Sequence, residues 1–97
     1  MDTYPTEDEL KTVTTYEVNN TNFHDLMDYI KSIWWSPDWG WKRDGDTYHI
    51  STGGWSGNED IIGALMHNTM FWMLYWKQSR VGGHYIFSMS RDWQASK

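Results

Sequence analysis

The chain has 97 residues, a formal net charge of −5 and no cysteine. A chain of this length forms one small domain around one core. Thirteen acidic residues against eight Lys and Arg argue against a protein that binds the nucleic-acid backbone through clustered cations. Without cysteine there is neither a disulfide framework nor thiolate chemistry, which fits a reducing compartment.

The two ends of the chain differ in composition from its middle. The first nine residues include four acidic side chains and one proline, which predicts a flexible acidic arm over 1–9. A single domain is expected over 10–90, followed by a C-terminal tail over 91–97. The acidic start lacks the apolar centre of a signal peptide, and no run approaches the roughly 18 apolar residues of a membrane span. We therefore expect a cytoplasmic protein that does not bind a membrane.

The first half of the domain predicts a strand, a helix and a hairpin. Residues 12–18 are rich in β-branched and aromatic side chains, which favours a strand. Residues 23–34 repeat their apolar side chains at helical spacing. Asp44-Gly45 is a signal for a two-residue turn, so the segments around 39–43 and 47–51 should pair as a hairpin.

The second half predicts one more helix and two more strands. The helix is expected over 57–67 and the last strand over 84–89. Between them, 69–79 contains six consecutive apolar residues, which favours a central strand covered on both faces, with a buried helix as the alternative. The order β-α-β-β-α-β-β predicts an α+β fold: a mixed sheet of about five strands with two helices mainly on one face. A right-handed crossover should make two strands within 47–77 parallel.

A glycine-rich loop over 53–58 joins a predicted strand to a predicted helix. Its glycines permit positive φ angles, and Ser56 with Glu59 fits a capping box at the start of the helix. The free N–H groups of a helix start can bind an anion. However, Glu59 and Asp60 would oppose an anion, and the loop matches neither the dinucleotide-binding fingerprint nor the P-loop. A tight, well-capped turn is the structural alternative.

Tryptophans are concentrated in the turn at 34–41 and in the glycine-rich loop. The structural explanation is that such large rings fill a small core. Trp39, Trp41 and Trp55 lie in or next to predicted turns, where tryptophans more often face a ligand or a partner. They could stack on a flat ring, a sugar face or a side chain of another protein.

A second glycine-rich turn, over 80–84, carries Arg80 and His84. The guanidinium of Arg80 could hold a phosphate or carboxylate in a bidentate way, although a solvated loop charge is the more ordinary interpretation. The four histidines lack metal-ligand spacing, and Ser56 lacks the Gly-x-Ser-x-Gly frame of a nucleophile. We therefore predict no catalytic activity, no cofactor and no metal.

Four segments carry a distinctive pattern: WWSPDWGW at 34–41, ISTGGWSGNEDII at 50–62, FWMLYW at 71–76 and GGHYIF at 82–87. Together they resemble small tryptophan-rich proteins of uncharacterised function encoded in phage and prophage genomes. The resemblance spans about 23–89 and implies an accessory phage product that acts in the bacterial cytoplasm. Many such proteins blunt host defence by capturing a nucleotide signal or by blocking a defence protein, which is an argument by analogy.

The leading hypothesis is a non-enzymatic binding protein with an aromatic pocket for a small, nucleotide-like ligand. The alternative is an inhibitor that blocks a host defence protein, such as a nuclease, through an acidic and aromatic surface. A second copy of the chain is a further candidate partner. The predicted ligand-binding residues are Trp39, Trp41, Gly53, Gly54, Trp55, Ser56, Asn58, Arg80 and His84.

Overall fold

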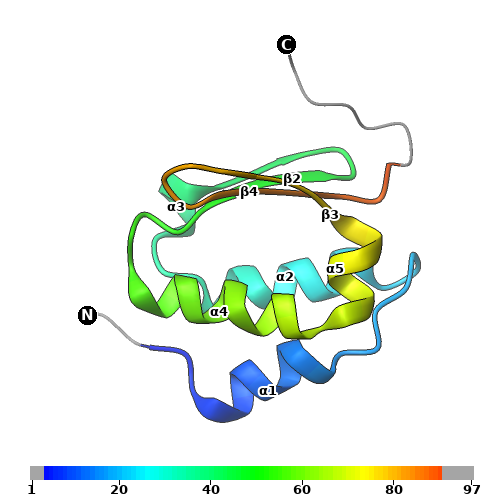
Figure 1. Ribbon diagram of the computed structural model, residues 1–97, viewed down its shortest axis with the longest axis horizontal. Helices are drawn as coiled ribbons and strands as arrows, with labels where there is room; N and C mark the ends of the chain where they lie inside the picture. Colours follow the sequence, from blue (N-terminus) through cyan, green and yellow to red (C-terminus); the bar gives the residue numbers. More distant parts are fainter. Residues whose placement is uncertain (1–3, 91–97) are drawn as a thin grey trace.

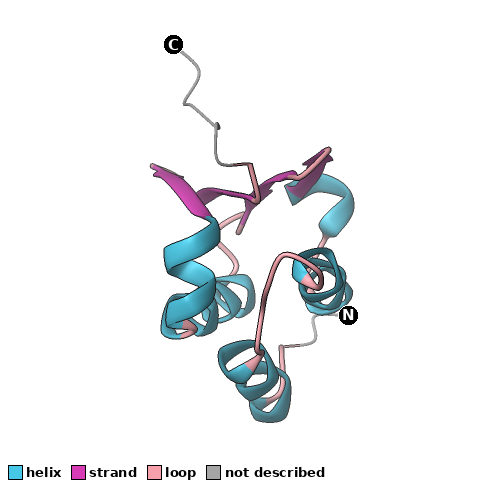
Figure 2. Cartoon of the chain, turned by 90° about the vertical axis from the view of Figure 1, so that its right-hand side faces the viewer, coloured by secondary structure: helices cyan, strands magenta, loops and turns pink. Residues whose placement is uncertain are grey.

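In the computed structural model, which describes residues 4–90, a sheet forms one layer and four of the helices form the other, while one short helix lies at the end of the sheet (Figures 1 and 2). The α+β class is confirmed, but the described residues form four strands and five helices rather than about five strands and two helices. The elements are α1 (Glu7–Thr15), α2 (Phe23–Ile33), α3 (Pro37–Gly40), β1 (Trp41–Asp44), β2 (Thr47–Ser51), α4 (Ser56–His67), α5 (Thr69–Tyr75), β3 (Trp76–Arg80) and β4 (His84–Ser88).

The sheet is antiparallel throughout, in the order β1-β2-β4-β3. The hairpin between β1 and β2 is confirmed, although its two loop residues are Gly45 and Asp46, because Asp44 pairs with Thr47. The predicted parallel crossover is wrong. Strand β4 inserts between β2 and β3, so the chain returns from the helices to the edge of the sheet and folds back as a second hairpin.

The strand predicted over 12–18 is wrong: 12–15 form the second half of helix α1, and 16–18 belong to the segment that follows it. A capping box starts this helix: the Thr6 hydroxyl accepts from the Glu9 N–H at 3.0 Å, and the Glu9 carboxylate accepts from the Thr6 N–H at 2.8 Å. Thr12 and Thr15 donate their hydroxyls to carbonyls one turn back, and Val13 is fully buried. Tertiary packing and the cap therefore override the β-preference of the threonines. Helix α1 begins at Glu7, within the stretch 1–9 that was predicted as a flexible arm. Residues 1–3 of that stretch, and the tail predicted over 91–97, lie outside the described residues.

The apolar run after residue 68 is also helical at first. The Asn68 side chain accepts from the Phe71 N–H at 3.1 Å and so caps α5. Phe71 and Tyr75, one turn apart, are buried, whereas Met70 and Met73 are exposed. The buried positions within the run therefore follow a helical period. The strand predicted over 69–79 is helical up to Tyr75, and only the part from Trp76 onward forms the strand β3.

The core lies between the sheet and the helices and is largely aromatic. The Phe23 ring of α2 lies 4.5 Å from the Tyr75 ring and 5.6 Å from the Tyr48 ring, measured between centroids. Because side chains alternate along a strand, the neighbours of Tyr48 and Ile50 point to the other side of the sheet. We call that side the outer face; the helices leave it uncovered, as Figure 2 shows.

Candidate functional site

The glycine-rich loop, the tryptophan turn and the turn at 80–84 meet at one end of the sheet. The Thr52 N–H donates to the Gly83 carbonyl at 3.0 Å. Gly83 has a φ of +81°, and any Cβ there would overlap the Thr52 hydroxyl. Gly53, with a φ of +63°, lies against the ring of Trp39. The backbone of the three predicted segments is therefore brought together, but their side chains separate into two regions.

Asn58 belongs to the scaffold of this end. Its side chain is 1% exposed, accepts from the Trp35 N–H at 2.8 Å and donates to the Trp35 carbonyl at 3.1 Å and the Thr52 carbonyl at 3.3 Å. These bonds fasten the start of α4 to the two neighbouring loops. Because both polar atoms of the amide are already hydrogen-bonded inside the protein, Asn58 has little to offer a ligand.

Trp55 and Ser56 are also engaged by the protein itself. The Trp55 ring stacks on Trp35 at 5.4 Å and contacts Tyr4 at 4.8 Å, while the hydroxyls of Ser56 and Tyr4 lie 2.9 Å apart. The predicted capping box is wrong, because the N-cap of α4 is Trp55 and no side chain of the described residues caps this helix. We call Tyr4, Trp35, Trp55 and Ser56 the aromatic end.

The remaining predicted residues of this region differ in exposure. Trp41 packs edge-to-face on Trp34 at 5.6 Å and on Tyr48 at 5.9 Å, and so extends the core. Trp39 is 68% exposed and carries its ring at the surface. Gly54 has a φ of +74°, and its N–H donates to the Thr52 hydroxyl at 3.3 Å, as a tight turn requires. Of the two tryptophans, Trp39 is the one whose ring is mostly exposed to solvent.

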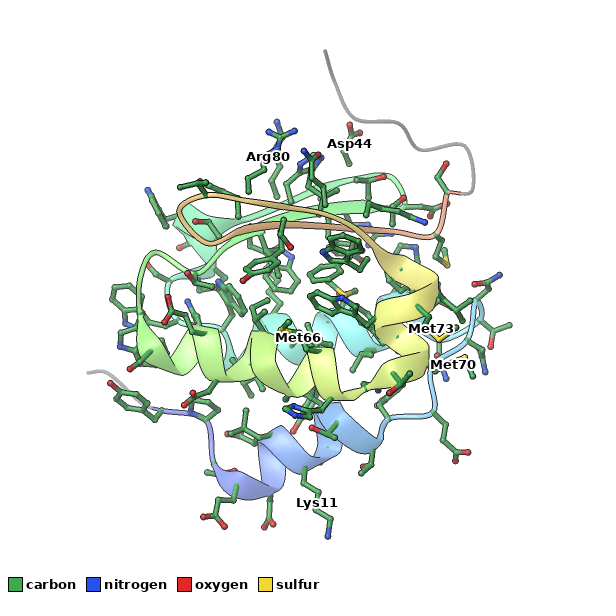
Figure 3. All side chains as sticks on the ribbon, in the orientation of Figure 1. Lys11, Asp44, Met66, Met70, Met73 and Arg80 are labelled. Atoms are coloured by element: carbon green, nitrogen blue, oxygen red, sulfur yellow. The ribbon has the colours of Figure 1, made fainter. Side chains whose placement is uncertain are left out.

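Arg80 and His84 lie on the outer face, where they border a pocket. The two residues are register partners on β3 and β4, and Figure 3 shows Arg80 pointing away from the helices. The cavity has a volume of about 130 Å³. We call it the outer pocket; it is lined by His49, Ile50, Arg80, His84, Tyr85 and Ile86.

The polar groups of the outer pocket have few partners. Within residues 4–90, no carboxylate lies within ion-pair distance of Arg80, and its guanidinium makes only a long contact, 3.4 Å, with the Gln78 amide oxygen. The imidazoles of His49 and His84 make no hydrogen bond to any described residue. Burial, and then the nearby positive charges of Lys42 and Arg80, lower the pKa of His49.

Charge is divided between the two layers. The strands carry four Lys and Arg and one acidic residue, Asp44, whereas α1, α2, α4 and α5 carry seven acidic residues and two lysines. Arg43 lies on the helix side of the sheet, over Tyr48. On the outer face the cations are Arg80 and Lys42, the register partner of His49, and Asp44 is the one carboxylate of the four strands. An acidic protein thus presents a locally positive surface, which would attract an anion to the sheet and not to the helices.

The sequence did not reveal a polar cluster that joins α2 to the hairpin. The His24 ring bonds through Nδ1 to the Tyr48 hydroxyl at 2.6 Å and through Nε2 to the Asp46 carboxylate at 3.0 Å. Arg43 lies over the Tyr48 ring at 5.5 Å, and burial raises the pKa of that tyrosine. Since Tyr48 is 1% exposed, this cluster stabilises the contact between α2 and the hairpin, and its tyrosine hydroxyl is not accessible as a nucleophile.

A larger groove, of about 260 Å³, runs beside the aromatic end. Trp34 and Trp35 line it together with Tyr4, and the buried indole N–H of Trp34 has no hydrogen-bond partner within residues 4–90. Its one charged side chain, Glu9, is engaged in the cap of α1. Apart from the buried Trp34 N–H, the groove therefore offers no free charged side chain comparable with Arg80 of the outer pocket.

Comparisons with known proteins gave no match, whether with family models, with curated proteins or with solved structures. Among the described residues, no group of three His, Asp or Glu side chains is arranged to hold a metal ion. None of the helices in the described part of the chain combines the length and apolar character needed to cross a bilayer. The candidate site thus rests on geometry and charge alone.

Proposed function

We propose that this protein is a non-enzymatic binding protein whose ligand is small and anionic, and that the outer pocket is its binding site. One observation carries the proposal: three nitrogen-bearing side chains, those of His49, Arg80 and His84, line one cavity. Among the described residues the two imidazoles have no hydrogen-bond partner, and Arg80 makes only its 3.4 Å contact with Gln78. Unpaired donors around a cavity, under positive potential, are what an anion requires. Arg80 would bind two oxygens of the anion, and the imidazoles would donate one hydrogen bond each.

A nucleotide-like ligand fits the surroundings of the outer pocket. The exposed Trp39 ring lies against Gly53, and the adjacent Thr52 is bonded to Gly83, next to His84. An aromatic ring at the same end of the sheet could stack on a base whose phosphate occupies the pocket. A host nucleotide signal, and the anti-defence role implied by the resemblance to phage proteins, stay predictions.

The test combines calorimetry with two probes, adenosine monophosphate and inorganic phosphate. Arg80→Ala should weaken binding of both, because both need the guanidinium, whereas Trp39→Ala should weaken binding of the nucleotide only. The matched control is Lys11→Ala, which removes the same charge from α1 on the opposite side of the molecule (Figure 3). Absence of heat with both probes at millimolar concentration would reject the proposed function.

The alternative, an inhibitor that binds a protein, is favoured by a different surface. The helical layer is acidic, and α5 exposes Met70 and Met73 without carrying any charge, with Met66 exposed at the end of α4 (Figure 3). Exposed methionines are typical of adaptable protein-binding surfaces. A basic nuclease could bind the acidic helices in the way that it binds the negatively charged backbone of nucleic acid.

This alternative predicts a different set of sensitive residues. Binding to a panel of purified basic nucleases should fall when Asp25 and Asp28 of α2, both exposed, are changed to Asn. Arg80→Ala should leave such binding unchanged or increase it, since it removes a positive charge. If Arg80→Ala alone abolishes activity and the α2 variant retains it, the alternative is rejected.

A further inference from the structure

The outer pocket is small compared with sites that enclose a whole ligand. Its volume is about 130 Å³, whereas pockets that enclose drug-sized molecules usually measure about 300–1,000 Å³. One tetrahedral oxyanion fills a space of this order, and a nucleoside does not. The remainder of any larger ligand must therefore project from the pocket across the surface.

The donors around the pocket come from several strands. Arg80 stands on β3 and His84 beside it on β4, while His49 stands on β2 with Lys42 as its register partner on β1. Arg80 and the two imidazoles line the pocket and can together contact several oxygens, and Lys42, outside the lining, adds a second permanent positive charge nearby. Asp44 is the only carboxylate among the strands, and its effect on His49 is smaller than that of Lys42 or Arg80.

The number of free oxygens separates two classes of phosphate ligand. A monoester carries three terminal oxygens and a charge of about −1.5 to −2 near pH 7, because its second pKa is about 6. A diester has two free oxygens, a charge of −1 and a substituent on each side. A pocket with room for one tetrahedral group can take three terminal oxygens if the one ester oxygen faces solvent, whereas a diester must direct two substituents out of the same small space.

We infer that the outer pocket binds the terminal phosphate monoester of its ligand and discriminates against phosphate diesters. Arg80 holds two terminal oxygens and the imidazoles of His49 and His84 approach the third, with the ester oxygen directed to solvent. The inference rests on the proposed function, because it specifies the ligand class of the same pocket. It separates nucleoside monophosphates and other ligands with a terminal phosphate from cyclic nucleotides and internucleotide linkages.

The test compares adenosine 5′-monophosphate with its 3′,5′-cyclic diester, which have the same base, sugar and single phosphorus. Titration calorimetry at one ionic strength should give a dissociation constant at least about tenfold lower for the monoester. Arg80→Ala should reduce this ratio toward one, because the arginine contacts two of the terminal oxygens. Lys11→Ala, which lowers the net charge equally, should preserve the ratio.

The possible outcomes distinguish the inference from the function on which it rests. Equal affinity for monoester and diester, each lost in Arg80→Ala, overturns the inference and leaves the proposed function in place. No binding of either ligand overturns both. Monoester preference that survives Arg80→Ala also overturns the inference, because the selectivity would then arise elsewhere on the protein. Thermal unfolding of each variant confirms that it is folded, and Arg80→Lys, which keeps the charge without the planar fork, should recover only part of the ratio.

Discussion

The aromatic end and the outer pocket lie near each other, but their polar groups differ in how fully they are hydrogen-bonded within the protein. At the aromatic end, Asn58 has three hydrogen bonds and Ser56 contacts Tyr4, so these groups hold the protein together. In the outer pocket, Arg80 and His84 have no comparable partner among the described residues. The comparison shows that the glycine-rich loop, the most distinctive motif of the sequence, stabilises the fold, whereas the less distinctive residues beside it keep polar groups available to a ligand.

The largest expected effect is on the scaffold. Asn58→Ala removes three hydrogen bonds, those to the N–H and carbonyl of Trp35 and to the carbonyl of Thr52, from a side chain that is 1% exposed. We expect the free energy of unfolding to fall by about 2–4 kcal/mol. Differential scanning calorimetry should show a clearly lower Tm. A Tm unchanged from the parent protein would mean that Asn58 is not structural and would reopen it as a ligand-binding residue.

The next effect is on binding without loss of stability. Arg80→Ala should weaken phosphate binding roughly 10- to 100-fold, because a charge-assisted hydrogen bond contributes about 1.5–3 kcal/mol. The free energy of unfolding should change by no more than about 0.5 kcal/mol, since Arg80 is exposed and without an ion pair in the described chain. Equal losses of affinity in Arg80→Ala and Lys11→Ala would show that net charge, and not the pocket, governs binding.

A smaller effect is expected at the exposed edge of the aromatic end. Ser56→Ala removes the contact with the Tyr4 hydroxyl and no capping bond. We expect destabilisation of at most about 1 kcal/mol in urea unfolding and an unchanged affinity for phosphate. A loss of affinity in a stable Ser56→Ala protein would restore the glycine-rich loop as the binding site and contradict the division into two regions.

The smallest effect is a pH dependence through His49. It faces Lys42 and Asp44 on β1, His84 and Ile86 on β4 and Arg80 on β3, and its folded-state pKa lies below the usual value. Protonation is thus less favourable in the folded than in the unfolded protein, so stability should fall as the pH drops below about 6.5. A bound dianion offsets the positive neighbours, so affinity for it should rise over the same range.

Inorganic sulfate is the suitable probe of that pH dependence, because its own charge does not change there. Its affinity should increase a few-fold from pH 8 to pH 6, and His49→Gln should flatten this increase while keeping a hydrogen-bond donor. A flat profile in the parent protein, or an identical slope in the variant, would exclude His49 as the titrating group.

Local patterns predicted some elements well. The apolar spacing of residues 23–34 predicted α2, and the turn signal around Gly45 predicted the first hairpin to within one residue. Prediction failed where tertiary contacts decide. The threonines of 12–15 became helical through a cap at Thr6 and packing of Val13, and the apolar run after Asn68 concealed a helical period within its continuous hydrophobicity.

The candidate site was predictable only in part, for a related reason. Arg80 and His84 were identified from their glycine-rich turn. The prediction placed them in one site with Trp55, whereas the ring of Trp55 packs on Tyr4 and Trp35 and does not line the outer pocket. His49 was missed because its role depends on β4 inserting beside β2, which places His49 and His84 on the same face. The bonds between the Asn58 amide and Trp35 could not be predicted, because nothing in the local sequence indicates this contact.

The most direct measurement is a titration with inorganic phosphate followed by nuclear magnetic resonance of side-chain nitrogens. The account predicts that the imidazole signals of His49 and His84 and the guanidinium signal of Arg80 shift and saturate together. The indole signals of Trp35 and Trp55 should stay in place. Shifts confined to those two indoles, with the histidine and arginine signals unchanged, would contradict the assignment of the outer pocket as the binding site.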